Sequence, residues 1–154
     1  MSHGVASLRA RRTGAVPELH KFGVQRRKEP MSNALTKVDE YDAITKTIQH
    51  YIDGARSGRG ADMKPAFHEQ ATVFGYVGPD LFAGPIQGLF DWNDQNGPAK
   101  EIEARIVSIE SCGTIAVARL EIDNWTGHRF TDLFTLLKVD GEWKVMNKVF
   151  HLHG

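Results

Sequence analysis

The sequence predicts an α+β fold in which a curved, mostly antiparallel sheet wraps around a long N-terminal helix and encloses a cavity. Two observations lead to this prediction. A long helical pattern precedes the strand patterns, and the segment from Ile115 to His153 alternates with period two around two tight-turn signals. The elements follow the order helix, helix, strand, strand, helix and four antiparallel strands, so the helices would cover one face of the sheet.

The first helix is predicted from Thr36 to about Ser57. Thr36 is the expected N-cap, and Gly58 ends the helix because glycine adopts the left-handed conformation without steric cost. The apolar side chains recur at helical spacing and form one stripe, which consists of Tyr41, Ile44, Ile48, Tyr51, Ile52 and Ala55.

Shorter elements follow the first helix. Asp62 is the expected cap of a second, short helix that runs to Phe67. Pro85 opens a third helix, at a position where its missing N–H costs nothing. The remaining elements are strands over residues 71–77, 81–83 and 101–110.

Two dipeptides, Thr126-Gly127 and Asp140-Gly141, predict the connections between the last three strands. Each fits a two-residue hairpin loop, since glycine tolerates the positive φ that such loops require. With both loops in place, Glu121 would lie opposite Asp132, Asp132 opposite Val149, and Phe130 opposite His151. His151 would then be within diagonal reach of Asp132.

This register predicts which side chains share a face of the sheet. One face mixes aromatic and charged residues, a mixture that is typical of a pocket wall. Its members would be Arg119, Glu121, Asp123, Phe130, Asp132, Phe134, Asn147 and His151, joined by Ile102, Ala104 and Ile106 of the preceding strand.

Length and composition are those of one globular domain. The chain has 154 residues, of which 41% are apolar and 25% charged, enough for a sizeable core. The net charge is zero, so neither nucleic acid nor a membrane is an expected partner. No apolar run approaches the roughly 18 residues of a membrane span. The single cysteine, Cys112, favours a reducing compartment, so we expect a cytoplasmic protein.

Residues 1–33 are expected to form a flexible tail in front of a domain over residues 34–154. Residues 1–30 contain seven basic and two acidic side chains and show no period. An organelle transit peptide or a nucleic-acid-binding arm are the alternatives for this stretch. Met31 also resembles a natural start of translation.

Four segments carry a resemblance to a known family: Phe67-His68, Gly84-Pro85-Ile86, Ile115 to Arg119, and Thr131 to His151 with its Asp-Gly-x-Trp hairpin. They resemble the nuclear transport factor 2-like superfamily, most closely its lumazine-binding branch, from about Val38 to His153. The resemblance implies a cone-shaped fold with an internal cavity. Enzymes such as ketosteroid isomerase and non-enzymes share that fold, so the fold alone does not assign a function.

The same resemblance bears on orientation and assembly. In the association domain of calcium/calmodulin-dependent kinase, an Ile-Arg-Leu strand points its arginine into the cavity, and Ala118-Arg119-Leu120 is similar to it. Members of the superfamily commonly dimerise through the outer face of the sheet. We therefore expect a homodimer through an outer face that bears Leu120, Leu133 and Phe150.

The first function that these patterns predict is the binding of a small, flat, partly polar organic ligand inside the cone. No cofactor is expected. The candidate ligand-binding residues are Tyr76, Trp92, Arg119, Glu121, Phe130, Asp132, Phe134, Asn147 and His151.

A cofactor-independent isomerase or dehydratase is the second reading, with Asp132, Glu121 and His151 as candidate catalytic residues. Two carboxylates that face each other in a hollow of low dielectric raise the pKa of one of them, which can then act as acid or base near neutral pH. Arg119 beside the pair would instead keep both ionised, as in a purely structural ion network. A protein–protein module with a vestigial cavity is the third reading.

The histidines near the end of the sheet could be read as a metal site. His128, His151 and His153 would share one face, and a His-x-His pair on a strand can bind zinc. The spacing is not diagnostic, so no metal is expected.

Overall fold

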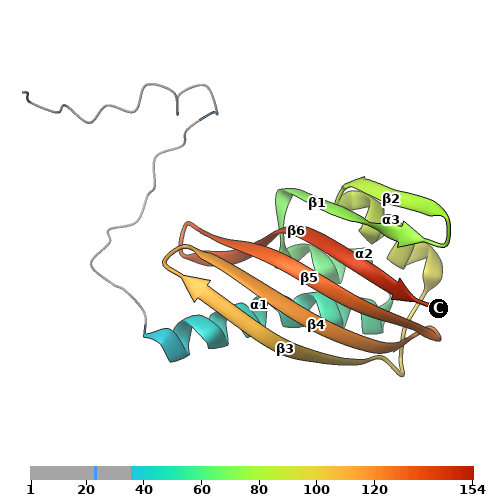
Figure 1. The fold of residues 1–154 in the computed structure, drawn as a ribbon, viewed down its shortest axis with the longest axis horizontal. Coiled ribbons are helices and arrows are strands. Elements are labelled where there is room, and N and C mark those ends of the chain that lie inside the picture. Colours follow the sequence, from blue (N-terminus) through green and yellow to red (C-terminus); the bar gives the residue numbers. More distant parts are fainter. Residues whose placement is uncertain (1–22, 24–35) are drawn as a thin grey trace, which may run out of the picture.

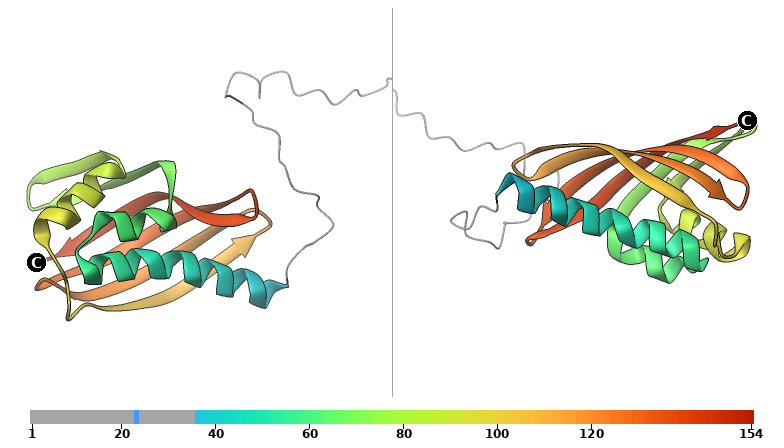
Figure 2. Two further views of the ribbon diagram at one scale, coloured as in Figure 1. Left: turned by 180° about the vertical axis from the view of Figure 1, so that it is seen from behind. Right: turned by 90° about the horizontal axis from the view of Figure 1, so that it is seen from below.

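The computed structural model describes Gly23 and residues 36–154. Apart from Gly23, the expected tail over residues 1–33 lies outside the described residues. The described part contains one six-stranded sheet, with helices along one of its faces (Figure 1). The predicted α+β architecture is confirmed. The sheet curves over the helices, as the two further views show (Figure 2).

The elements are α1 Lys37–Ser57, α2 Gly60–Met63, the 3₁₀-helix η2 Lys64–Ala66, β1 Phe67–Val77, β2 Asp80–Pro85, α3 Gln87–Asn96, β3 Glu103–Cys112, β4 Ile115–Trp125, β5 His128–Val139 and β6 Glu142–His153. The sheet has the strand order β2-β1-β6-β5-β4-β3. Neighbouring strands are antiparallel, except that β1 and β6 are parallel.

Helix α1 begins and ends where the sequence predicts. The Thr36 hydroxyl accepts from the Asp39 backbone N–H, and the Asp39 carboxylate accepts from the Thr36 backbone N–H, so two otherwise unpaired donors are satisfied. Gly58 ends the helix at a φ of 72°. The apolar stripe faces the sheet, with Ile44, Ile48 and Tyr51 completely buried.

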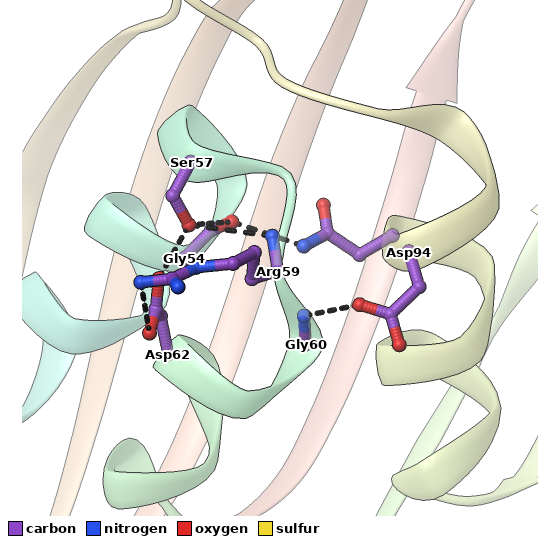
Figure 3. Close-up of polar contacts among 7 residues, drawn as sticks. Gly54, Ser57, Arg59, Gly60, Asp62 and Asp94 are labelled. Carbon is purple, nitrogen blue, oxygen red and sulfur yellow. Dashed lines mark hydrogen bonds and ion pairs between the residues drawn. The ribbon is translucent and has the colours of Figure 1, made fainter.

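The junction between α1, α2 and α3 differs from the prediction (Figure 3). The short helix begins at Gly60, whose backbone N–H donates to Asp94 Oδ1 at 2.6 Å and so ties α2 to α3. Asp62 does not cap it. The Asp62 carboxylate accepts instead from Ser57 Oγ at 2.7 Å and from Arg59 Nε at 2.9 Å. Helix α3 begins after Pro85, which is the last residue of β2.

The loop between β4 and β5 is the predicted two-residue turn at residues 126–127. A β-bulge lies beside this turn, at the end of β4. There Asn124 adopts a φ of 57°, and the pairing of β4 with β5 shifts by one residue. Leu120, rather than Glu121, therefore lies opposite Asp132.

The β5–β6 hairpin also combines a predicted turn with a one-residue register shift. Its loop at residues 140–141 is also the predicted two-residue turn. A second irregularity leaves Met146 without a ladder partner and shifts the register by one residue. As a result Asp132 lies opposite Phe150, and the expected pairing with Val149 does not form.

A one-residue shift moves the side chains that follow to the other face of the sheet. The expectation that Arg119, Glu121, Asn147 and His151 point into the cone is therefore wrong, because all four lie on the outer face. The inner face carries Ala118, Leu120, Ile122, Phe130, Asp132, Phe134 and Lys148, together with the partly buried Phe150.

The same shift corrects the expected dimer face. Leu120 is completely buried and Phe150 packs against the core, so neither belongs to the outer surface. Leu133 does lie there, with 53% of its surface exposed.

Within the described part of the chain, no helix is both long and apolar enough to cross a membrane.

Candidate functional site

A cavity of about 160 Å³ lies between α3 and the inner face of the sheet. Typical ligand pockets are larger, at roughly 300–1,000 Å³, but an engineered apolar cavity of about 150 Å³ holds benzene. The space therefore suits a group of about one ring. Its walls are mostly apolar and include Trp92, Trp125, His128, Phe130, Lys148 and Phe150.

Three buried polar side chains meet beside this cavity, and one of them, Lys148, lines it. The Tyr51 hydroxyl, from the middle of α1, donates to Asp132 Oδ2 on β5 at 2.5 Å. Lys148 Nζ, on the neighbouring β6, lies 3.7 Å from Asp132 Oδ1. That distance is an ion-pair contact but is longer than a hydrogen bond. The Lys148 and Asp132 side chains are 3% and 0% exposed, so water screens this pair very little.

Burial perturbs all three groups. It raises the pKa of Asp132 above its ordinary value, although Lys148 and the Tyr51 hydrogen bond act in the opposite direction. It lowers the pKa of Lys148, against the attraction of Asp132. Burial and the Asp132 carboxylate raise the pKa of Tyr51, so its hydroxyl keeps its proton and acts as a donor. A carboxyl and an amine shifted toward their neutral forms are suited to proton transfer.

Aromatic rings surround the lysine head group. Lys148 Nζ lies 4.8 Å from the ring centre of Phe150, 5.2 Å from Tyr51, 5.7 Å from Trp125 and 6.0 Å from Phe130. Ring faces attract a cation, and they also exclude water from it. The lysine is therefore held in an apolar enclosure at the edge of the cavity.

Two polar atoms of this site are buried without a hydrogen-bond partner: Trp125 Nε1 and Asp132 Oδ1. A buried donor or acceptor without a partner typically costs about 1–3 kcal/mol. Trp125 also lines the cavity. An acceptor atom on a bound molecule would remove the cost at Trp125, so the indole N–H is a candidate ligand contact.

The structure brings part of the predicted ligand-binding set to the cavity. Trp92 and Phe130 line it, and Asp132 lies just behind its wall. Phe134 is buried in the core, where its ring packs edge-on against Tyr51 at 5.2 Å. Tyr76 lies on the outer face and is 63% exposed, because it pairs with the outward-facing part of β6. The roles of these residues stay predictions.

Arg119 and Glu121 form a separate cluster on the outer face. Arg119 Nη2 donates to Glu121 Oε1 at 2.7 Å, and the Thr131 hydroxyl donates to Glu121 Oε2 at 2.7 Å. These hydrogen bonds lower the pKa of Glu121. The expected pair of facing carboxylates, Glu121 with Asp132, does not form, because their side chains point to opposite faces.

His151 and Asn147 also lie outside the cone. The His151 ring packs against the His153 ring at 4.7 Å, and Asn147 Nδ2 donates to Thr72 Oγ1 at 2.9 Å. The expected contact between His151 and Asp132 is absent, because the register shift in β6 turns His151 to the outer face. Among the described residues, no group of three or more His, Cys, Asp or Glu side chains could hold a metal ion.

Three residues of the site were not predicted from the sequence: Tyr51, Trp125 and Lys148. Tyr51 had a detectable signal, since a tyrosine in the apolar stripe of a helix needs a partner for its hydroxyl once buried. Lys148 gave none, because the turn-based register places it on the opposite face from Asp132.

The fold is that of an NTF2-like protein, and solved structures agree. An NTF2-like protein from Methylobacillus flagellatus KT is 52% identical, with a TM-score of 0.76 over 77% of this chain and 96% of that one. An NTF2-like protein from Shewanella baltica OS155 is 44% identical, with a TM-score of 0.76 over 79% of this chain and 99% of that one. The profile of the family described as "Putative lumazine-binding" matches residues 39–151, and the chain belongs to this family.

A curated relative carries the name of an enzyme. The aldolase FrzH of Cladobotryum sp. is 32% identical over 113 residues, which cover 73% of this chain and 90% of the relative. A ketosteroid isomerase-like protein from Erwinia carotovora atroseptica is 13% identical with a TM-score of 0.57, which is a likeness of fold alone.

Proposed function

We propose that the chain binds a small, flat organic molecule with a carbonyl oxygen in the cavity between α3 and the sheet. The observation that carries this proposal is a buried amine and an unpartnered indole N–H, from Lys148 and Trp125, at the wall of a mostly apolar cavity. Apolar walls with a few convergent polar groups are typical of small-molecule sites. The family's description supports a small ligand of this kind.

Benzaldehyde is a suitable first probe, since it combines one flat ring with one carbonyl group. An NMR titration should shift the indole N–H signals of Trp92 and Trp125, which line the cavity. The Trp125→Phe variant removes the donor but keeps an aromatic ring, and should weaken binding by about 1 kcal/mol, the net contribution of one hydrogen bond.

Tyr76→Phe is the matched control, because Tyr76 is exposed on the outer face. It should leave the affinity unchanged. Failure of benzaldehyde to shift any cavity signal would contradict the proposal and would favour the third reading, a protein–protein module with a vestigial cavity. Native mass spectrometry of protein purified from its host can then identify a retained natural ligand.

A second candidate function is cofactor-independent acid–base catalysis on a carbonyl compound, of the isomerase, dehydratase or aldol type. The buried contact of Tyr51 with Asp132, next to Lys148, favours it. The aldolase relative also supports carbonyl chemistry. Of the three predicted catalytic candidates, Asp132 keeps this role in the proposal, while Glu121 and His151 lose it because they face outward.

Cyclohexanone in deuterated water tests this second function. An acid–base catalyst exchanges the hydrogens next to the carbonyl for deuterium, which NMR follows directly. Asp132→Asn should abolish the catalysed exchange and still bind the ketone. Exchange at the same rate in the variant would contradict catalysis by Asp132.

We further propose that the chain forms a homodimer in the cytoplasm. The outer face of the sheet exposes large apolar side chains, more than a solvated sheet face normally carries. They are Phe74, Val107, Ile115, Val117, Leu133 and Val149. The single cysteine, Cys112, is a free thiol, which suits a reducing compartment.

A further inference from the structure

We infer that Lys148 Nζ is a nucleophile that forms a Schiff base with a carbonyl compound bound in the cavity. This inference rests on the proposed function, since it requires that a carbonyl compound enters. It goes further by assigning the site a covalent step and a reacting atom. The lysine lies at the cavity wall, is 2% exposed, and faces aromatic rings.

The geometry around Lys148 differs from that of a lysine that only neutralises a charge. The nearest oxygen of Asp132 is 3.7 Å from Nζ, beyond hydrogen-bond distance. Asp132 instead has its short hydrogen bond with Tyr51, which leaves its other oxygen unpartnered. The amine is thus close to the carboxyl group without being clamped by it, and a proton can pass between them through one water or after a small side-chain movement.

The surroundings favour the neutral amine, which is the reactive form. Burial lowers the pKa of Lys148, whereas Asp132 acts in the opposite direction. The other titratable groups near the lysine are Tyr51 from α1, whose ring it faces, and His128, which also lines the cavity. Desolvated lysines in apolar pockets are the usual ones to form Schiff bases.

The reaction balances without an oxidant or reductant. The lone pair of Nζ forms a bond to the carbonyl carbon, and the C=O π electrons move to oxygen, which takes a proton. The nitrogen of this carbinolamine then loses a proton, the hydroxyl group takes a second one and leaves as water, and the C=N bond forms. Asp132 is placed to relay these protons, with Tyr51 donating to it.

A Schiff base makes the bonds next to the former carbonyl carbon easier to break. The protonated C=N group attracts electrons more strongly than C=O, so the adjacent C–H or C–C bond breaks more readily. Such a group supports the formation and cleavage of carbon–carbon bonds. Carbon–carbon bond chemistry is also what the name of the aldolase relative indicates for that protein.

Reductive trapping tests the inference on the full chain. Benzaldehyde is added at about pH 7, borohydride reduces any Schiff base to a stable secondary amine, and peptide mass spectrometry locates the added benzyl group. We expect the adduct on Lys148. Lys144, on the same strand and more exposed, lies outside the cavity and should be labelled much more weakly at this pH.

Two variants complete the experiment. Lys148→Arg keeps the charge but cannot form a Schiff base, and should lose the adduct. Lys144→Arg should keep it. The mapping on the unmodified protein does not depend on whether the Lys148 variant folds.

The outcomes separate the two proposals. Benzaldehyde that shifts the cavity signals without an adduct on Lys148 would overturn the Schiff base and leave the proposed binding function intact. Equal labelling of Lys148 and Lys144 would also overturn it, because the site would then provide no special reactivity. If benzaldehyde neither shifts the cavity signals nor labels Lys148, the Schiff base and the proposed binding function are both overturned.

Discussion

The Tyr51 hydroxyl donates a 2.5 Å hydrogen bond to Asp132 Oδ2, which joins the middle of α1 to β5 inside the cone. Both side chains are completely buried. The bond connects residues 81 positions apart, so it exists only once the helix has docked on the sheet. It also leaves one carboxylate oxygen facing Lys148. This contact is the link between the core and the candidate site.

The Tyr51→Phe variant should lower the free energy of unfolding by about 1.5–3 kcal/mol, because a buried carboxyl group loses its hydrogen bond. Urea denaturation measures this change. Tyr41→Phe, on the same helix but partly exposed, should change the stability little. Equal effects of the two substitutions would show that the Asp132 contact contributes nothing to stability.

Asp132 should make the fold less stable as pH rises above 3.8. Its pKa is raised in the folded state above the ordinary value of 3.8, mainly by burial. The folded state therefore binds the proton more tightly, and this contribution is complete below pH 3.8 and is lost as pH rises through the folded pKa.

Comparison with Asp132→Asn isolates this contribution, since asparagine does not titrate. As pH rises from 3.8, the difference in unfolding free energy should move in favour of the variant. Urea denaturation at a series of pH values follows it. A difference that moves in favour of the wild type would mean that Lys148 stabilises the ionised carboxylate more than burial penalises it.

Leu133→Asp should convert the proposed dimer into monomers without unfolding the chain. Leu133 is half-exposed on the outer face, where a charge would be solvated in a monomer and buried in a dimer. Light scattering at micromolar concentration measures the change. Val38→Asp, on the exposed side of α1, is the control and should remain dimeric. Persistence of the dimer in the Leu133 variant would argue against this face.

Gly54→Ala should destabilise the protein, although alanine is the better helix former. Gly54 lies in α1 against Met63 of α2, and an added Cβ would lie 2.7 Å from the Met63 backbone nitrogen. The clash involves backbone, so α2 must move away from α1. We expect a loss of about 1–3 kcal/mol, typical of overpacking. Gly88→Ala, where the nearest atom would be 3.5 Å away, is the control in thermal melts. An unchanged melting temperature for the Gly54 variant would show that α2 adjusts freely.

Features set by neighbouring residues were predictable from the sequence. The first helix begins and ends as predicted, because Thr36 and Gly58 act through hydrogen bonds and backbone angles within one turn. Both hairpin loops were also predictable, since Gly127 and Gly141 supply the positive φ that each loop needs. The order of elements and the family resemblance followed from such local signals.

The identity of the inward-facing residues was decided by the tertiary structure. Two β-bulges, near Asn124 and Met146, each shift a strand by one residue beyond its correctly predicted turn. A turn determines where a ladder begins, whereas a bulge forms where the twist of the strands and their packing against α1 require it. Because side chains alternate with period two, each shift exchanged the faces of a strand. That exchange placed Lys148 beside Asp132 and moved Glu121 to the outside.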